Sequence, residues 1–194
     1  MSGLNFVSKI MMLFFAALGF GWYSCMQHYA DKAYAKSYNL VFKAEEAAAR
    51  HNYKEAMQLY DEAIKVSSSQ YAAFNNRGCL KIKLKDPGGS IDDFDKAIAI
   101  EPNFEGGYSN KGYALLVLGK HSEAIANYSR AIACRPCKQI YISRAKARKI
   151  AGDLEGAAED LKRAKAASES PPSSKKLHRS TYGACMLCYG SPGS

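Results

Sequence analysis

The sequence predicts an all-α fold, an α-solenoid of four stacked helix-turn-helix units. The first observation is a repeat of about 34 residues, which places small side chains in one column: Ala56, Ser90, Ala124 and Ala157. The second is a column of large side chains four positions later: Tyr60, Phe94, Tyr128 and Leu161. The third is the helical spacing of apolar residues on both sides of a turn within each unit. Each unit is therefore expected to be a helical hairpin.

Stacking is required because a single hairpin leaves one apolar face in contact with water. A further column holds tiny residues where helices must approach closely: Ala44, Gly78, Gly112 and Ala145. Helix axes about 8–10 Å apart leave no room there for larger side chains. The predicted divisions are a hydrophobic segment with a helical stalk, four hairpins and a tail, at residues 1–36, 37–70, 71–104, 105–137, 138–170 and 171–194.

The second and third units resemble a tetratricopeptide repeat over most of their length. The residues that carry the resemblance are Phe74–Gly78, Ser90–Ile98 and Glu101–Asn103 in the second unit, and Tyr108–Gly112, Ala124–Ile132 and Pro136 in the third. The resemblance covers about residues 37–170 and implies a protein that binds other proteins. The outer units depart from the pattern, with Ser68 and Glu169 in place of the closing proline. Such decay is expected of terminal units that face water.

The resemblance also implies that the first helix of each unit lines a concave groove for a partner peptide or helix. It assigns eight residues to this groove: Asn75, Asn76, Cys79, Ile82, Ser109, Asn110, Tyr113 and Leu116. Asn76 and Asn110 occupy equivalent positions, and an amide offers both a donor and an acceptor to a partner main chain. The alternative is that these amides satisfy the neighbouring helix turn. Val41, Glu45 and Gly106 replace the basic residues that bind anionic peptide ends in some family members, so such ends are not expected.

The N-terminal segment contains an uncharged run, Ile10–Met26. Its length is at the lower edge of the roughly 17–25 residues that span a bilayer, and Trp22 and Tyr23 suit an interfacial belt. We therefore expect a single-pass membrane protein with an uncleaved anchor, whose helix continues into the first unit as a short stalk. The alternatives are a cleaved signal peptide, which leaves a secreted or periplasmic adaptor, and lipid attachment at Cys25.

Charge and tail composition limit the classes of partner. The formal net charge is +9, and the tail from Pro171 is basic and rich in Ser, Pro and Gly, which predicts disorder. The basic residues of the repeats lie among acidic ones on amphipathic helices, and no base-reading motif occurs. Nucleic acid is therefore not an expected partner.

The sequence contains no constellation typical of an enzyme. It lacks a Gly-rich phosphate loop, a pair of histidines at metal-binding spacing and a nucleophile elbow. Adjacent acids such as Asp92 and Asp93 diverge around a helix, so we expect them to be solvated rather than paired for acid-base chemistry. Neither catalysis nor a small-molecule substrate is expected.

Two CxxC pairs provide the alternative to a pure binding protein. Cys134 with Cys137 and Cys185 with Cys188 suit tetrahedral zinc or redox disulfides. Cys134 also occupies a column that holds Val66 elsewhere, which is typical of core packing. The sequence thus predicts a membrane-anchored scaffold without a cofactor, and the alternative is a redox or zinc module supported by the repeats.

Overall fold

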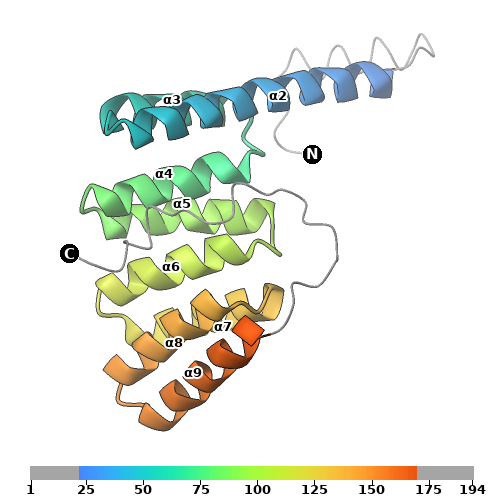
Figure 1. The fold of residues 1–194 in the computed structure, drawn as a ribbon. Helices are drawn as coiled ribbons and strands as arrows, with labels where there is room; N and C mark the ends of the chain where they lie inside the picture. The colour runs from blue at the N-terminus through green and yellow to red at the C-terminus, as the bar shows by residue number, and fades with distance from the viewer. Residues whose placement is uncertain (1–21, 170–194) are drawn as a thin grey trace.

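The computed structural model describes residues 22–169, and these residues are helical without any strand (Figure 1). The helices are α2 (Trp22–Ala49), α3 (Tyr53–Val66), α4 (Tyr71–Lys83), α5 (Pro87–Ile100), α6 (Glu105–Val117), α7 (His121–Cys134), α8 (Lys138–Ile150) and α9 (Leu154–Glu169). They pack in sequence as four antiparallel hairpins, α2 with α3, α4 with α5, α6 with α7 and α8 with α9. The predicted all-α solenoid is confirmed.

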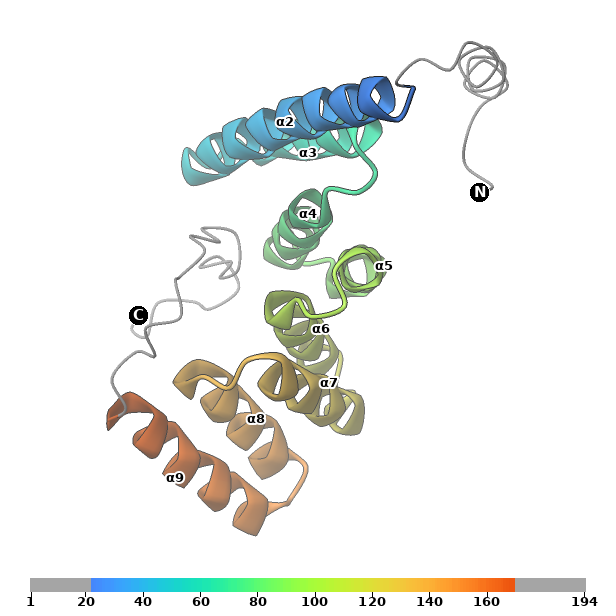
Figure 2. The same ribbon diagram turned by 90° about the vertical axis from the view of Figure 1, so that its right-hand side faces the viewer.

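The hairpins follow one another along a curved path. Figure 2 shows α4 and α6 on the inner side of this curve and α5 and α7 on its outer side. Each hairpin contacts the next mainly through its second helix, which packs against the first helix of the following hairpin. The first helices therefore form a continuous concave face, as expected for a stack of similar hairpins.

Within each hairpin, the tiny residue of the repeat lies on the first helix and the large residue lies on the second helix, and the two pack against one another. A Cβ atom on Gly78 would lie 2.8 Å from the Phe94 ring, and one on Gly112 would lie 3.1 Å from the Tyr128 ring. Glycine at these positions lets an aromatic ring lie directly on the backbone of the first helix. The fourth hairpin carries Ala145 instead, and the large side chain of its column is the smaller Leu161.

The turns between paired helices share one left-handed backbone position. It is occupied by Gly119 and Gly152, with φ of 75° and 88°, and by the non-glycine residues His51 and Lys85, with φ of 62° and 68°. These four residues recur at the period of the repeat, so the same turn closes every hairpin. Glycine is favoured in this conformation because it has no Cβ.

One buried carboxylate, that of Asp93, corrects the expectation that the paired acids are solvated. Asp92 is exposed, but Asp93 is buried between α4 and α5, where Arg77 Nη2 and Lys81 Nζ lie 2.5 and 2.7 Å from its oxygens. The hydrogen bond to Asp93 is the main reason that the pKa of Arg77 is raised. The expectation was wrong because two adjacent residues of a helix point in different directions. One acid of the pair therefore faces solvent, and the other faces the neighbouring helix.

The same arrangement recurs two hairpins later, around Asp160. Arg144 donates to both oxygens of Asp160 at 2.9 and 2.6 Å, and Arg148 donates to one of them at 3.0 Å. Asp160 is buried, and so is most of Arg144. The third hairpin has Asn127 at the equivalent position, so these charged networks alternate along the stack.

The described helices correct the predicted membrane location. Within residues 22–169, no helix is long and apolar enough to cross a bilayer. Helix α2 is the longest of the described helices, with 28 residues, but it carries the charged side chains Asp31, Lys32 and Lys36 within its first 15 residues. The run Ile10–Met26, on which the prediction depended, reaches the described chain only from Trp22 onward, and the rest of it lies outside the described residues.

Candidate partner-binding face

The eight residues assigned to the groove lie on α4 and α6, and they differ in accessibility. Five are buried: Asn75, Asn76, Cys79, Ser109 and Asn110. Three are half-buried: Ile82, Tyr113 and Leu116. Most of the polar groups that were expected to contact a partner are therefore enclosed by the chain itself, and the accessible part of the set is mainly apolar.

The asparagines form a hydrogen-bonded ladder across three hairpins. Asn110 Nδ2 on α6 donates to Asn75 Oδ1 on α4 at 2.8 Å, and Asn75 Nδ2 donates to Asn76 Oδ1 at 3.0 Å. Asn76 Nδ2 in turn donates to Glu45 Oε1 on α2 at 2.6 Å. The amide donors of Asn110 and Asn76 thus join one first helix to the next, and that of Asn75 links the two bonds within α4, which fixes the spacing of the concave face.

Cys79 and the three half-buried residues pack against two clusters of the core. Cys79 belongs to a buried cluster with Phe94 and Ala114, and Ile82 and Tyr113 pack against its edge. Leu116 packs against a second cluster, which contains Leu115 and Tyr128. One side of each half-buried side chain therefore supports the fold, and the other side remains available on the surface.

Three apolar side chains on this face are much more exposed than the predicted ones. Phe42 on α2 is 52% exposed, Val117 on α6 is 53% exposed and Ile150 on α8 is 52% exposed. Phe42 occupies the repeat position of Asn76 and Asn110, and Ile150 that of Val117. Extending the column of Asn76 and Asn110 into the first unit would have identified Phe42, whereas Val117 and Ile150 share the next column after that of Leu116, which was not assigned to the groove.

The charge of this face is concentrated at its C-terminal end. Lys146 and Lys149 on α8 are exposed, and neither forms an ion pair with the part of the chain that the structure describes. They occupy the repeat positions of Tyr113 and Leu116. The face thus changes from apolar on α6 to basic on α8, because the last repeat replaces apolar residues by lysines.

The described cysteines do not establish a redox or metal site. Cys79, Cys134 and Cys137 are not joined in disulfides, and no cluster of three metal-binding side chains occurs in residues 22–169. Burial, with a smaller contribution from Glu105, raises the pKa of the Cys134 thiol. A raised pKa disfavours the thiolate that metal binding or disulfide exchange requires. The predicted partners Cys185 and Cys188 lie outside the described residues.

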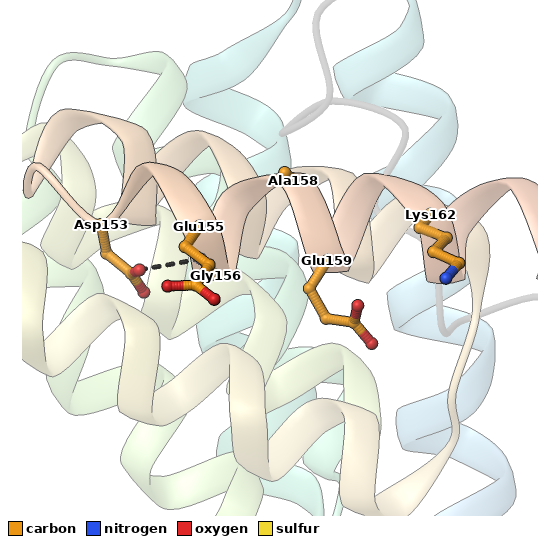
Figure 3. Close-up of a pocket in the computed structure, with 6 residues that line it drawn as sticks. All are labelled: Asp153, Glu155, Gly156, Ala158, Glu159 and Lys162. Carbon is orange, nitrogen blue, oxygen red and sulfur yellow. Dashed lines mark hydrogen bonds between the residues drawn. The ribbon is translucent and has the colours of Figure 1, made fainter.

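A hollow on the last helix is the other surface feature with several polar groups. It is lined by Asp153, Glu155, Gly156, Ala158, Glu159 and Lys162, all at the start or middle of α9 (Figure 3). Asp153 Oδ1 accepts a hydrogen bond from the Gly156 backbone N–H at 2.8 Å, which caps the helix. The hollow contains none of the eight predicted groove residues and lies on a different hairpin.

Family comparisons identify the repeat. Two models of the tetratricopeptide repeat match the sequence, one at residues 71–104 and the other at residues 109–172. Together they cover about half of the chain and include the second, third and fourth hairpins. No curated protein matches the sequence at a significant level.

Several solved structures share the fold at low sequence identity. A crystal structure of MamA has a TM-score of 0.64 and 19% identity, covering 69% of this chain and 78% of that one. The first repeat domain of Spaghetti (RPAP3), bound to the HSP90 peptide SRMEEVD, has a TM-score of 0.52 and 21% identity, covering 70% and 95%. YrrB, described as having an unusual peptide-binding site, has a TM-score of 0.58 and 18% identity, covering 75% and 69%.

Proposed function

This chain is a tetratricopeptide repeat protein, and we propose that it is a scaffold that binds a segment of another protein on its concave face. The observation that carries the proposal is the exposure of Phe42, Val117 and Ile150, each by about half, on three different first helices. Apolar side chains that are exposed on several first helices offer a partner segment more than one point of contact along the same face. The partner segment is expected to be an apolar peptide or one face of an amphipathic helix.

The internal contacts of this face support a binding role. The asparagine ladder holds α2, α4 and α6 at fixed spacing, and its amides are used before any partner arrives. A surface that is already ordered loses little conformational entropy on binding. Of the structural neighbours, one is bound to a peptide and another is described by its peptide-binding site, which is consistent with the same use of the fold here.

The proposal is tested by charged substitutions at accessible positions. Phe42→Glu and Val117→Glu place a carboxylate on the concave face, and both side chains are exposed enough to leave the stacking intact. We expect each to reduce capture of partner proteins from the native host at least tenfold, measured by quantitative mass spectrometry. The loss follows from desolvating a charge against an apolar partner.

Ala126→Glu is the matched control, because Ala126 is exposed on α7, a second helix on the outer side of the curve. Circular dichroism melts of all three variants confirm that folding is unchanged. Equal loss in the control, or unchanged capture in both concave-face variants, would show that partners bind elsewhere.

A further inference from the structure

The last hairpin exposes a surface that is covered in every other hairpin. On α3, α5 and α7, one stripe of side chains faces the next hairpin and is buried or half-buried: Tyr53, Met57, Tyr60 and Ile64; Pro87, Ile91, Phe94 and Ile98; His121, Ile125, Tyr128 and Ile132. The equivalent stripe on α9 is Leu154, Ala158, Leu161 and Lys165, and all four residues are exposed. Leu154 is 65% exposed and Leu161 is 53% exposed.

The cover of the earlier stripes comes from the first helix of the following hairpin. Phe94 clusters with Ala114 of α6, and Tyr128 clusters with Ile140 and Ala147 of α8. After α9 no such helix follows within residues 22–169. The part of the α9 stripe formed by Leu154, Ala158 and Leu161 is therefore a helix-packing surface that no following helix of residues 22–169 covers.

Two side chains of opposite charge, Glu155 and Lys162, lie beside this stripe. Glu155 and Lys162 are seven residues apart, so they lie on the same side of α9, two turns from one another. Both are exposed, and neither forms an ion pair with another residue of the described chain. Figure 3 shows both side chains on the hollowed side of the helix. The acid lies toward the start of α9 and the base toward its end.

We propose that this surface binds a second copy of the chain, with the two α9 helices antiparallel and Ala158 near the two-fold axis. At a rise of 1.5 Å per residue, Leu161 lies about 4.5 Å beyond Ala158 and Leu154 lies about 6 Å before it. An antiparallel partner therefore places its Leu154 beside Leu161. By the same spacing, the partner's Lys162 lies beside Glu155.

Each of these contacts occurs twice, because a two-fold interface is self-complementary. The small side chain of Ala158 allows the two backbones to approach closely at the axis. One pair of hairpins buries less apolar surface than a standard interface, so we expect a dimer with a dissociation constant on the order of micromolar. The dimer would carry two concave faces, and a divalent partner would gain avidity from both. This inference does not depend on the function proposed for the concave face.

Sedimentation velocity of the full-length chain over a range of concentrations tests the interface. We expect a reversible monomer–dimer equilibrium for the natural sequence and a monomer for Ala158→Arg, which places two like charges and two long side chains at the axis. Ala158 is exposed, so this variant is expected to keep the melting temperature of the monomer. A natural sequence that is monomeric to about 100 μM, or a dimer that Ala158→Arg leaves intact, would overturn the proposal.

Charge reversal at Glu155 and Lys162 provides a second test, which leaves the side chain of Ala158 at the two-fold axis unchanged. Glu155→Lys and Lys162→Glu are each expected to weaken the dimer roughly tenfold, and the double variant is expected to restore it. Glu62→Lys, at an exposed position on α3, is the control and is expected to have no effect. Failure of the double variant to restore dimerisation would exclude the predicted pairing. If deleting residues 171–194 converts a monomer into a dimer, the tail occupies the surface instead, and the proposal for the full chain is wrong.

Discussion

At the scale of single residues, polar side chains inside the stack are satisfied by partners that the chain itself supplies. Asp93 and Asp160 each accept from two basic side chains, and the two networks use equivalent positions of the second and fourth hairpins. Lys81 and Arg148 also donate to equivalent backbone carbonyls, those of Gly89 and Gly156. These contacts join the two helices of one hairpin and make its internal register specific.

Asp160→Asn tests the energetic role of a buried carboxylate. The substitution leaves the buried Arg144 without its counter-charge and removes one of the two acidic partners of Arg148, which keeps Asp153. We expect the free energy of unfolding to fall by about 3–5 kcal/mol, measured by urea denaturation. The matched control is Asp95→Asn, because Asp95 pairs with Lys111 but is half exposed, and we expect a loss of at most about 1 kcal/mol. Equal effects of the two substitutions would contradict the assignment.

Sequence reasoning could place these residues on helices but could not pair them. The asparagines at positions 76 and 110 share a repeat column, yet their partners differ, Glu45 for Asn76 and Asn75 for Asn110. A repeat column identifies residues that occupy equivalent places, whereas a hydrogen bond depends on which residues the adjacent hairpin presents. The ladder therefore became visible only in the folded structure, together with the burial of Asp93.

At the scale of helices and hairpins, the pairing of glycine with an aromatic ring determines how closely the two helices approach. The second and third hairpins have Gly78 beneath Phe94 and Gly112 beneath Tyr128. The tiny and large columns that predicted the fold are thus two sides of one contact. Periodic small and large residues were sufficient to predict this packing, because close helix approach requires both.

Gly78→Ala tests this contact directly. The added Cβ would lie 2.8 Å from a carbon of the Phe94 ring, which cannot move freely because it is buried. We expect the free energy of unfolding to fall by about 1–3 kcal/mol. In a Phe94→Leu background, which imitates Ala145 and Leu161 of the fourth hairpin, the added cost of Gly78→Ala is expected to fall below about 1 kcal/mol. If the effects of the two substitutions were additive in this double-mutant cycle, the Phe94 ring would not be the reason that glycine is needed at position 78.

At the scale of the whole molecule, repetition produces one curved stack with two different surfaces for which we propose a binding partner. The concave face belongs to α2, α4, α6 and α8, and the uncovered stripe belongs to α9 at the end of the stack. The period of the sequence predicted the stack, and the resemblance to the tetratricopeptide repeat predicted its concave face. It did not predict which residues of that face are accessible, because the exposure of Phe42 and Ile150 depends on the ends of the array, where the repeat pattern weakens.

The central claim is that the inner side of the curve binds partner proteins, and site-specific photo-crosslinking in the native host tests it most directly. A photoreactive amino acid is placed at Phe42 or Val117 on the concave face, and at Gln58 or Ala126, equivalent positions of the second helices α3 and α7, of which Figure 2 shows α7 on the outer side; all four positions are exposed. The account predicts discrete crosslinked partners from the two concave positions and none from the outer ones. Crosslinks of equal yield from Gln58 and Ala126, or from these two positions alone, would contradict it.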